Sequence, residues 1–253
     1  MDVKKTDIYI VDGSADHGTL ALESRFRHLK LAELPVGSLP ENAFFILDSK
    51  FCELHDVIGA FFRQKRPFAF ASVCDIDEDG DLVRLCETAR RKKSRAWMLG
   101  GLRVLPVVAS TKEIITGGCL GELKSFSVVS GFEKGDEEGR MLHDAVAWMC
   151  GAQAKQNEGG VEPGIERTFD GKSLEITAVG SAGELFAEYD FKEGKGSMTT
   201  TVNHHRRTRS FGAANARTME LNLLAAFVPT MTATLPGLVP LRELATSLKG
   251  LGD

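Results

Sequence analysis

The sequence predicts an α/β protein in which a shortened, doubly wound parallel sheet is followed by an α+β domain with a mostly antiparallel, open sheet. In the first half of the chain, strand-like runs alternate with helix-like segments, as in βαβ units. In the second half, strand-like runs are separated by short turns, as in an antiparallel meander. The 253 residues are enough for two domains, which we expect at 1–120 and 121–253.

The strands of the first half are predicted from short apolar runs rich in β-branched and aromatic residues. They are expected at Asp7–Asp12, Ala43–Leu47, Phe68–Val73 and Ala96–Leu99, with a weaker one at Leu29–Val36. The helices are expected at Thr19–His28, Glu53–Arg63, Asp79–Lys92 and Pro106–Thr116. In Glu53–Arg63, for example, the apolar residues from Leu54 to Phe62 fall on one helical face.

The second half begins with one more strand and a helix before the meander. The predicted strands are Leu123–Ser130, Ile165–Phe169, Ser173–Val179, Glu184–Phe191 and Ser197–Asn203. The predicted helices are Glu138–Cys150, Met219–Val228 and Val239–Leu248. Turns such as Asp170-Gly171 separate the later strands, which favours antiparallel pairing.

Composition excludes several classes of protein. The chain has 31 Lys and Arg against 35 Asp and Glu, a net charge of −4, whereas nucleic-acid binding needs a basic face. The five cysteines include no C-x-x-C pair, which favours free thiols in a reducing compartment. No run approaches the ~18–20 apolar residues of a membrane span, and no signal sequence precedes the first strand. We therefore expect a cytoplasmic protein without nucleic-acid or membrane partners.

A glycine-containing turn follows the first predicted strand and precedes a possible helix, which is the context of a dinucleotide-binding fingerprint. Its candidate cofactor-binding residues are Gly13, Ser14, Ala15 and Gly18. Ala15 stands where the fingerprint has its middle glycine, and Asp16 adds a negative charge beside the phosphates. Glu33 is the nearest acidic residue for a ribose. The alternative is an ordinary βα turn.

Two further patterns argue against a metal site. The loop Asp75–Leu82 matches the first half of a calcium-binding EF-hand loop, but its twelfth position is Cys86 instead of glutamate. A solvated loop leading into an acidic helix start explains it. The six histidines show neither H-x-x-x-H nor H-E-x-x-H spacing, so no zinc site is expected.

Two groups of residues are candidates for binding or proton transfer. His143 and Asp144 are adjacent on a predicted helix, where histidine suits proton transfer or has a structural role. The run from His204 to Arg209 is basic and lies at the end of a predicted strand. It suits an anionic substrate, or it is a sheet edge blunted by positive charge.

From Asn42 to Ser130 the sequence resembles the second half of the nucleotide-binding domain of the Gfo/Idh/MocA oxidoreductases, the relatives of glucose–fructose oxidoreductase and inositol dehydrogenase. A strand ends in a polar turn before a histidine in AFFILDSKFCELH. The phrase TKEIITGGCLGELKSFSVV is similar to the family's helix, its glycine-containing link and the first strand of its second domain. The helix ending in HDAVAWMCG and the later meander also resemble that second domain.

The resemblance implies a Rossmann-like first domain that binds NAD or NADP, and hydride transfer to or from a sugar, polyol or similar small hydroxylated substrate. It implies a homo-oligomer, such as a dimer, formed through the second-domain sheet. His143 with Asp144 would be the catalytic acid/base, and Ser49 in the polar turn would join the cofactor-binding residues. Arg103, His204 and Arg206 would bind the substrate.

The sequence also departs from the family. The E-K-P motif, whose lysine lies at the family's active site, falls on Ala71–Val73, and no lysine is present there. Gly139 stands where the family has an aspartate, and the region before Asn42 is short. The alternative is therefore a non-catalytic relative that has lost cofactor binding and acts as a binding or assembly partner.

Overall fold

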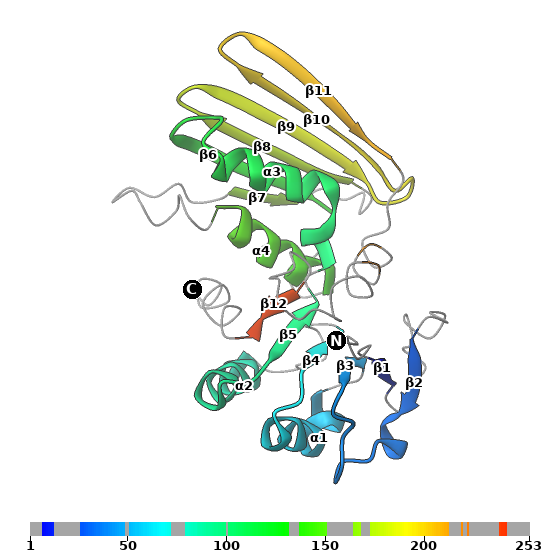
Figure 1. The fold of residues 1–253 in the computed structure, drawn as a ribbon. Coiled ribbons are helices and arrows are strands. Elements are labelled where there is room, and N and C mark those ends of the chain that lie inside the picture. The colour runs from blue at the N-terminus through cyan, green and yellow to red at the C-terminus, as the bar shows by residue number, and fades with distance from the viewer. Residues whose placement is uncertain are drawn as a thin grey trace, which may run out of the picture. The chain divides into compact units, whose positions relative to one another are not determined.

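The computed structural model describes residues 7–12, 26–48, 51–71, 79–99, 101–131, 137–150, 164–167, 173–212, 219, 222 and 238–241. The chain divides into two compact units, one formed by Met1–Leu99 with Leu221–Asp253 and the other by Gly100–Glu220. The first has a mainly parallel sheet with helices and the second a mainly antiparallel sheet with helices (Figure 1). The predicted fold class is thereby confirmed.

The sheet of the first unit has six strands in the order β12-β5-β4-β3-β1-β2. Their bounds are β1 Asp7–Asp12, β2 Arg27–Lys30, β3 Ala43–Asp48, β4 Phe68–Phe70, β5 Ala96–Leu99 and β12 Leu238–Pro240. Strands β1 to β5 run parallel, and β12 pairs antiparallel with β5. All six residues of β3 are buried, as expected for a central strand of a parallel sheet.

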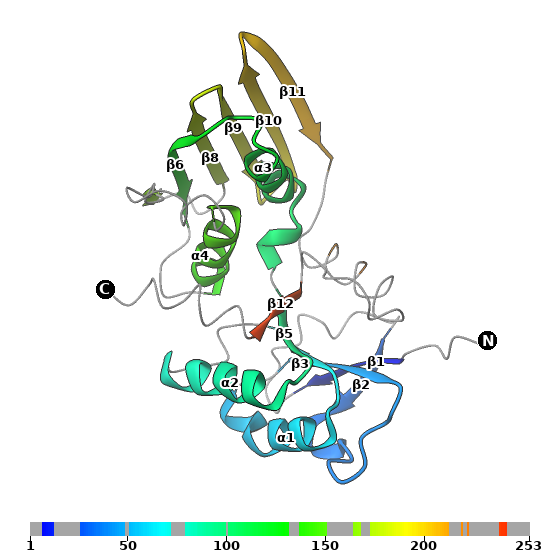
Figure 2. The ribbon, with the colours of Figure 1, turned by 60° about the vertical axis from the view of Figure 1, so that its left-hand side comes forward.

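Helices α1 (Phe51–Gln64) and α2 (Asp79–Lys92) lie on the same face of this sheet (Figure 2). Their apolar residues join one buried cluster with the side chains on that face of β3 and β4. Aromatic rings form its centre: Phe61 lies 4.9 Å from Phe45 and 5.0 Å from Phe68, measured between ring centroids. The opposite face has its own buried cluster, which includes Ile10, Phe44 and Ile46.

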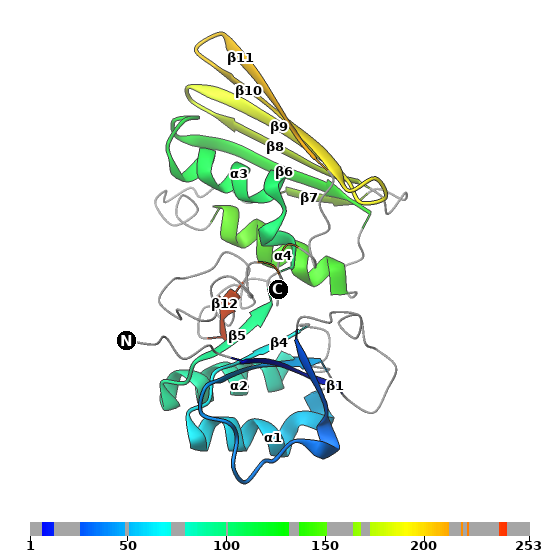
Figure 3. The same ribbon diagram turned by 45° about the vertical axis from the view of Figure 1, so that its right-hand side comes forward.

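The sheet of the second unit also has six strands, in the order β11-β10-β9-β8-β6-β7. Their bounds are β6 Leu123–Ser130, β7 Gly164–Arg167, β8 Ser173–Gly180, β9 Gly183–Asp190, β10 Lys195–Val202 and β11 His205–Phe211. Neighbouring strands are antiparallel except β6 and β7. Helices α3 (Pro106–Thr116) and α4 (Glu137–Cys150) cover one face, as Figure 3 shows. The short 3-10 helix η2 (Gly101–Val104) precedes α3.

The observed units differ from the expected domains at two places. η2 and α3 belong to the second unit, because Leu102, Val107 and Ile115 are buried in the same cluster as the side chains of its sheet. The boundary therefore lies near residue 100 and not near 120. The chain also returns to the first unit after the second, where β12 pairs with β5.

Three expected elements are wrong in type or extent. His28 lies in β2, although a helix was expected to end there, and residues 19–25 lie outside the described residues. Only part of the expected strand Leu29–Val36 is extended, since the 3-10 helix Leu31–Glu33 begins after β2. The expected helix Val239–Leu248 is contradicted at its start, where Val239 and Pro240 lie in β12. Proline lacks an N–H group, and at the sheet edge this costs little.

None of the helices in the described part of the chain has the length and apolarity needed to cross a membrane.

Candidate functional site

The carboxyl ends of β1, β2 and β3 lie at one edge of the parallel sheet. From β1 the chain goes to β2 on one side and then returns past β1 to β3 on the other. The strand order therefore reverses between β1 and β3. In open α/β sheets, ligands bind in the crevice outside the carboxyl ends of the strands at such a point. We use the name switch-point crevice for the carboxyl end of the sheet at β1 and β3, where the fold rule expects a ligand.

Two carboxylates end the strands on either side of the switch-point crevice. Asp12 is the last residue of β1 and Asp48 the last of β3, and they are partners in the strand register. Asp48 is 9% exposed. Oδ2 of Asp12 lies 3.4 Å from Nδ1 of His28. Oδ1 of Asp12 is buried, with no hydrogen-bond donor among the described residues.

A cation lies on the other side of β1. Lys30, the last residue of β2, is the register partner of Asp12 and is exposed. Glu33, the acidic residue that the sequence suggested for a ribose, lies in the 3-10 helix after β2. The crevice thus combines a carboxylate oxygen that has no donor within the described part of the chain with a lysine at the register position beside it. A ligand with hydroxyl groups and a phosphate, such as a nucleotide, fits that chemistry.

The sequence reasoning missed Asp12, Asp48 and Lys30 as site residues, although a signal was available for the first two. Asp12 ends one expected strand and Asp48 directly follows another, and the carboxyl ends of parallel strands share one edge of the sheet. Lys30 lies inside the expected strand Leu29–Val36, so the sequence carried no such signal for it. The predicted cofactor residues Gly13, Ser14, Ala15, Gly18 and Ser49 lie outside the described residues. Residues 75–78 of the acidic loop also lie outside the described residues. Within the described ranges, no group of three or more potential metal ligands occurs.

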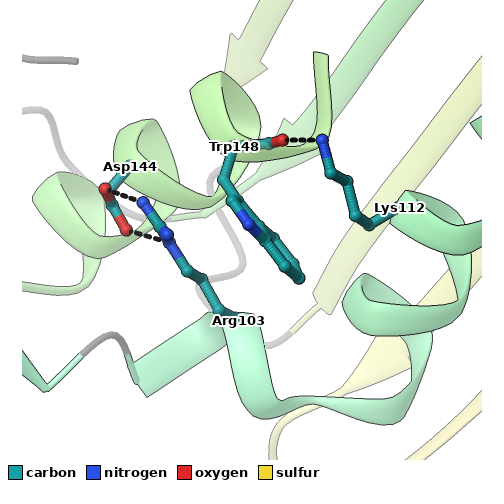
Figure 4. Close-up of polar contacts among 4 residues, drawn as sticks. All are labelled: Arg103, Lys112, Asp144 and Trp148. Carbon is teal, nitrogen blue, oxygen red and sulfur yellow. Dashed lines mark hydrogen bonds and ion pairs between the residues drawn. The ribbon is translucent and has the colours of Figure 1, made fainter. Parts of the chain in front are cut away.

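In the second unit, the structure brings Arg103 of η2 and Asp144 of α4 together (Figure 4). The Arg103 Nε donates to Oδ2 of Asp144 at 2.6 Å, and a terminal guanidinium nitrogen donates to Oδ1 at 2.5 Å. Both side chains are buried, with 7% and 8% of their surface exposed. Burial raises the pKa of the Asp144 carboxyl above its ordinary value, and the Arg103 charge and hydrogen bonds oppose that rise.

Trp148 connects this pair to a second cation. The guanidinium carbon of Arg103 lies 5.3 Å from the Trp148 ring centroid, and Nζ of Lys112 lies 5.7 Å from it. Nζ of Lys112 also donates to the backbone oxygen of Trp148 at 2.5 Å. Burial lowers the pKa of Lys112. These contacts link η2, α3 and α4 to one another (Figure 4).

The predicted substrate and acid/base residues are thus only partly brought together. Arg103 and Asp144 bind each other, so both oxygens of the carboxylate accept hydrogen bonds from the guanidinium. His143 is in α4, but its side chain lies outside the described residues. His204 lies in the two-residue turn between β10 and β11, and Arg206 lies in the edge strand β11, both exposed.

The described cysteines differ in burial and should therefore differ in reactivity. Burial raises the pKa of the Cys150 thiol to about 11, whereas Cys119 is exposed. The thiolate is the reactive form, so iodoacetamide at neutral pH should alkylate Cys119 first and leave Cys150 and the buried Cys86 largely unmodified. Peptide mass spectrometry over a time course measures each site. Alkylation of Cys150 as fast as Cys119 would contradict this burial.

Comparison with known proteins adds information about the fold. No protein-family model matches the chain, and no curated protein matches its sequence. An oxidoreductase from Pseudomonas syringae has a TM-score of 0.70 at 10% identity, over 98% of this chain and 95% of that one. An oxidoreductase from Sinorhizobium meliloti has a TM-score of 0.69 at 11% identity, over 98% and 96%.

A third structure, from Desulfitobacterium hafniense, is named as a candidate NADPH-dependent oxidoreductase. Its TM-score is 0.65 at 14% identity, over 96% of this chain and 94% of that one. At such identities the likeness concerns the fold. The chain is therefore similar in fold to these proteins over nearly its whole length.

Proposed function

We propose that the protein is an oxidoreductase of the Gfo/Idh/MocA type, which transfers a hydride between NAD or NADP and a sugar, polyol or similar small hydroxylated substrate. The switch-point crevice carries the proposal, because the order β2-β1-β3-β4-β5 is a doubly wound order, and nucleotide ligands bind such sheets at the switch point between β1 and β3. Oδ1 of Asp12, for which the described residues provide no hydrogen-bond donor, suits a ribose hydroxyl. The similarity in fold to oxidoreductases and the family resemblance from Asn42 onward support the same activity.

The chain's own residues would hold the cofactor as follows. The turn with Gly13, Ser14, Ala15 and Gly18 would face the phosphates with backbone N–H groups, and Ser49 would lie beside it after β3. Asp12 would accept a hydrogen bond from a ribose hydroxyl, and Lys30 would bind a 2′-phosphate. The bound nicotinamide would supply the hydride acceptor or donor.

On the substrate side, His143 would hold or release the proton of the reacting hydroxyl at a ring nitrogen. Asp144 would act as a positioning residue, because its contact with Arg103 fixes the helix that carries His143. Arg103 would then contribute to the substrate site through that helix. His204 and Arg206 would bind an anionic group of the substrate.

The proposal is tested by thermal unfolding with NAD, NADH, NADP and NADPH. A ligand that binds only the folded protein, at about 100 times its Kd, adds ~2.7 kcal/mol. For a protein of this size that corresponds to a Tm increase of about 5–10 °C. We expect the largest increase with NADP or NADPH because of Lys30. No increase with any of the four would contradict cofactor binding.

The position of Lys30 predicts how the preference between NADPH and NADH can be changed. Lys30→Glu should weaken NADPH binding at least tenfold relative to NADH, because a carboxylate replaces the ammonium group beside the 2′-phosphate. Isothermal titration with both nucleotides measures the ratio. Lys192→Glu, the same charge change at an exposed site in the second unit, is the control and should leave the ratio unchanged.

A second candidate function is that of a non-catalytic relative without a cofactor. It is favoured by the side-by-side position of Asp12 and Asp48 in the register, since two carboxylates at the crevice repel a pyrophosphate. The same nucleotide titration decides between the two functions. A protein of this kind would act through a partner surface.

We further propose that copies of the chain associate through the open face of the second sheet. Phe186 lies on that face with 42% of its surface exposed, and its register partners on either side are Thr177 and Thr199. Phe186→Asp should therefore convert an oligomer to monomers in light scattering after size exclusion. Lys192→Glu again serves as the control. A wild-type protein that is monomeric at high micromolar concentration would contradict the proposal.

A further inference from the structure

The amino ends of β3, β4 and β5 border a pocket of about 450 Å³ in the first unit. It lies at the opposite edge of the parallel sheet from the switch-point crevice. Four of its lining residues are cationic, Lys65, Arg66, Lys93 and Arg95, and one is acidic, Glu41. Nothing in the proposed oxidoreductase chemistry uses this pocket. We call it the amino-end pocket.

Two equivalent helix ends build the amino-end pocket. Lys65 follows α1 with a φ of 53°, and Lys93 follows α2 with a φ of 51°. The next residue in each case donates its N–H to a carbonyl five residues earlier, Arg66 to Phe61 and Ser94 to Ala89, both at 3.0 Å. This is the bond of a Schellman motif. Because β4 and β5 are neighbours in the sheet, the two connections lie together and concentrate their positive charges.

Helix dipoles do not account for these cations. The last turns of α1 and α2 already carry Arg63 and the run Arg90–Lys92, which is where cations stabilise a helix end. The cations of the amino-end pocket come after the helix ends. They border a concave space instead of lying along a helix surface.

Two polar atoms of the lining point to a ligand. Nε of Arg66 and Oγ of Ser94 are buried, and neither has a hydrogen-bond partner among the described residues. Leaving a buried donor unsatisfied is costly, and a ligand oxygen that reached either atom after a side-chain rotation would remove that cost. The ion pair of Arg66 with Glu41 does not supply such an acceptor, since it spans 4.0 Å and Glu41 is 86% exposed.

We propose that the amino-end pocket binds a small ligand bearing a phosphate or diphosphate group. Arginine and serine would donate hydrogen bonds to its oxygens, and the lysines would act as point charges. The volume lies in the range of small-molecule sites, roughly 300–1,000 Å³. A polynucleotide is disfavoured, because the chain as a whole is acidic and the cations form a pocket instead of an extended stripe.

The test is isothermal titration of the full chain with inorganic pyrophosphate at low salt. We expect saturable binding with one site per chain that weakens as NaCl is added. Arg66→Gln and Arg95→Gln should each reduce the affinity by about tenfold, as expected for lost charged hydrogen bonds. Glu41→Gln should increase the affinity, because it removes the one carboxylate of the lining.

Controls separate this site from general attraction and from the switch-point crevice. Arg91→Gln removes an exposed cation from the last turn of α2 that does not line the pocket, and it should leave the affinity unchanged. Arg66→Gln should leave any Tm increase with NADPH unchanged. Circular dichroism establishes that each variant is folded, and Arg95, which is exposed, gives a variant that leaves the core intact.

Four results would overturn the proposal. The first is the absence of pyrophosphate binding, and the second is an equal loss of affinity in Arg91→Gln. The third is binding that persists in Arg66→Gln and Arg95→Gln but is abolished by Lys30→Glu, which would assign the anion to the switch-point crevice. The fourth is tighter binding to a single-stranded RNA oligonucleotide than to pyrophosphate, which would indicate a different class of ligand.

Discussion

Asp144→Asn is expected to lower the free energy of unfolding of the second unit by about 3–5 kcal/mol, because it leaves the buried Arg103 charge uncompensated. Asparagine has nearly the same volume as aspartate, so packing changes little. The present pair is bidentate and almost completely buried. In this geometry the Coulomb attraction and the hydrogen bonds offset the free-energy cost of burying the guanidinium. Without the negative charge of Asp144, that desolvation cost is no longer offset, and the folded state is destabilised.

Trp148 gives a local measurement, since its ring lies against Arg103. Urea unfolding followed by fluorescence in a Trp97→Phe background reports on the second unit alone, because the chain has two tryptophans. Glu184→Gln, an exposed site on β9, is the control and should change stability by less than about 0.5 kcal/mol. The double variant Arg103→Met with Asp144→Leu should recover much of the loss. Unchanged stability in Asp144→Asn would contradict the positioning role.

Phe61→Ala should destabilise the first unit by about 3–5 kcal/mol, the usual cost of removing a fully buried aromatic side chain. Phe61 has no exposed surface and contacts the rings of Phe45 and Phe68. Both of those rings belong to strands of the sheet, so the substitution opens a cavity where α1 meets β3 and β4.

Urea unfolding followed by Trp97 fluorescence in a Trp148→Phe background reports on the first unit. The matched control is Phe186→Ala, the same change at a side chain that is 42% exposed, with the second unit followed by Trp148 fluorescence. Phe186→Ala should lower the free energy of unfolding far less, since the Phe186 side chain buries less apolar surface in the folded protein. Equal losses for the two substitutions would contradict the burial of Phe61.

Much of the fold could be predicted because local sequence carries the signal for most elements. The runs at α2, β5, α3 and β6 have the predicted bounds, since the two helices have an apolar face and the two strands are short runs rich in apolar or β-branched residues. β11 has six exposed residues in succession and no apolar alternation, so only its pairing with β10 makes it a strand. β12 depends likewise on an edge of β5 that lies about half the chain earlier.

The residues of the candidate site were harder to predict, because the pairs that form it are far apart in the sequence. Arg103 and Asp144 are 41 residues apart, and no local pattern shows that they form a pair. Arg103 was therefore expected to bind the substrate and Asp144 to act with His143. The pairing of Asp12 with Asp48 required the strand order, which sequence periodicity does not contain.

The return of the chain through β12 has a consequence for biosynthesis. The second unit is one continuous segment, Gly100–Glu220, whereas the first needs a strand that leaves the ribosome after it. During translation the second unit can therefore fold while the open edge of β5 still lacks its neighbour. An uncovered strand edge is a template for pairing with other chains. Until β12 has been synthesised and pairs with it, the edge of β5 is therefore a place where two nascent chains can associate.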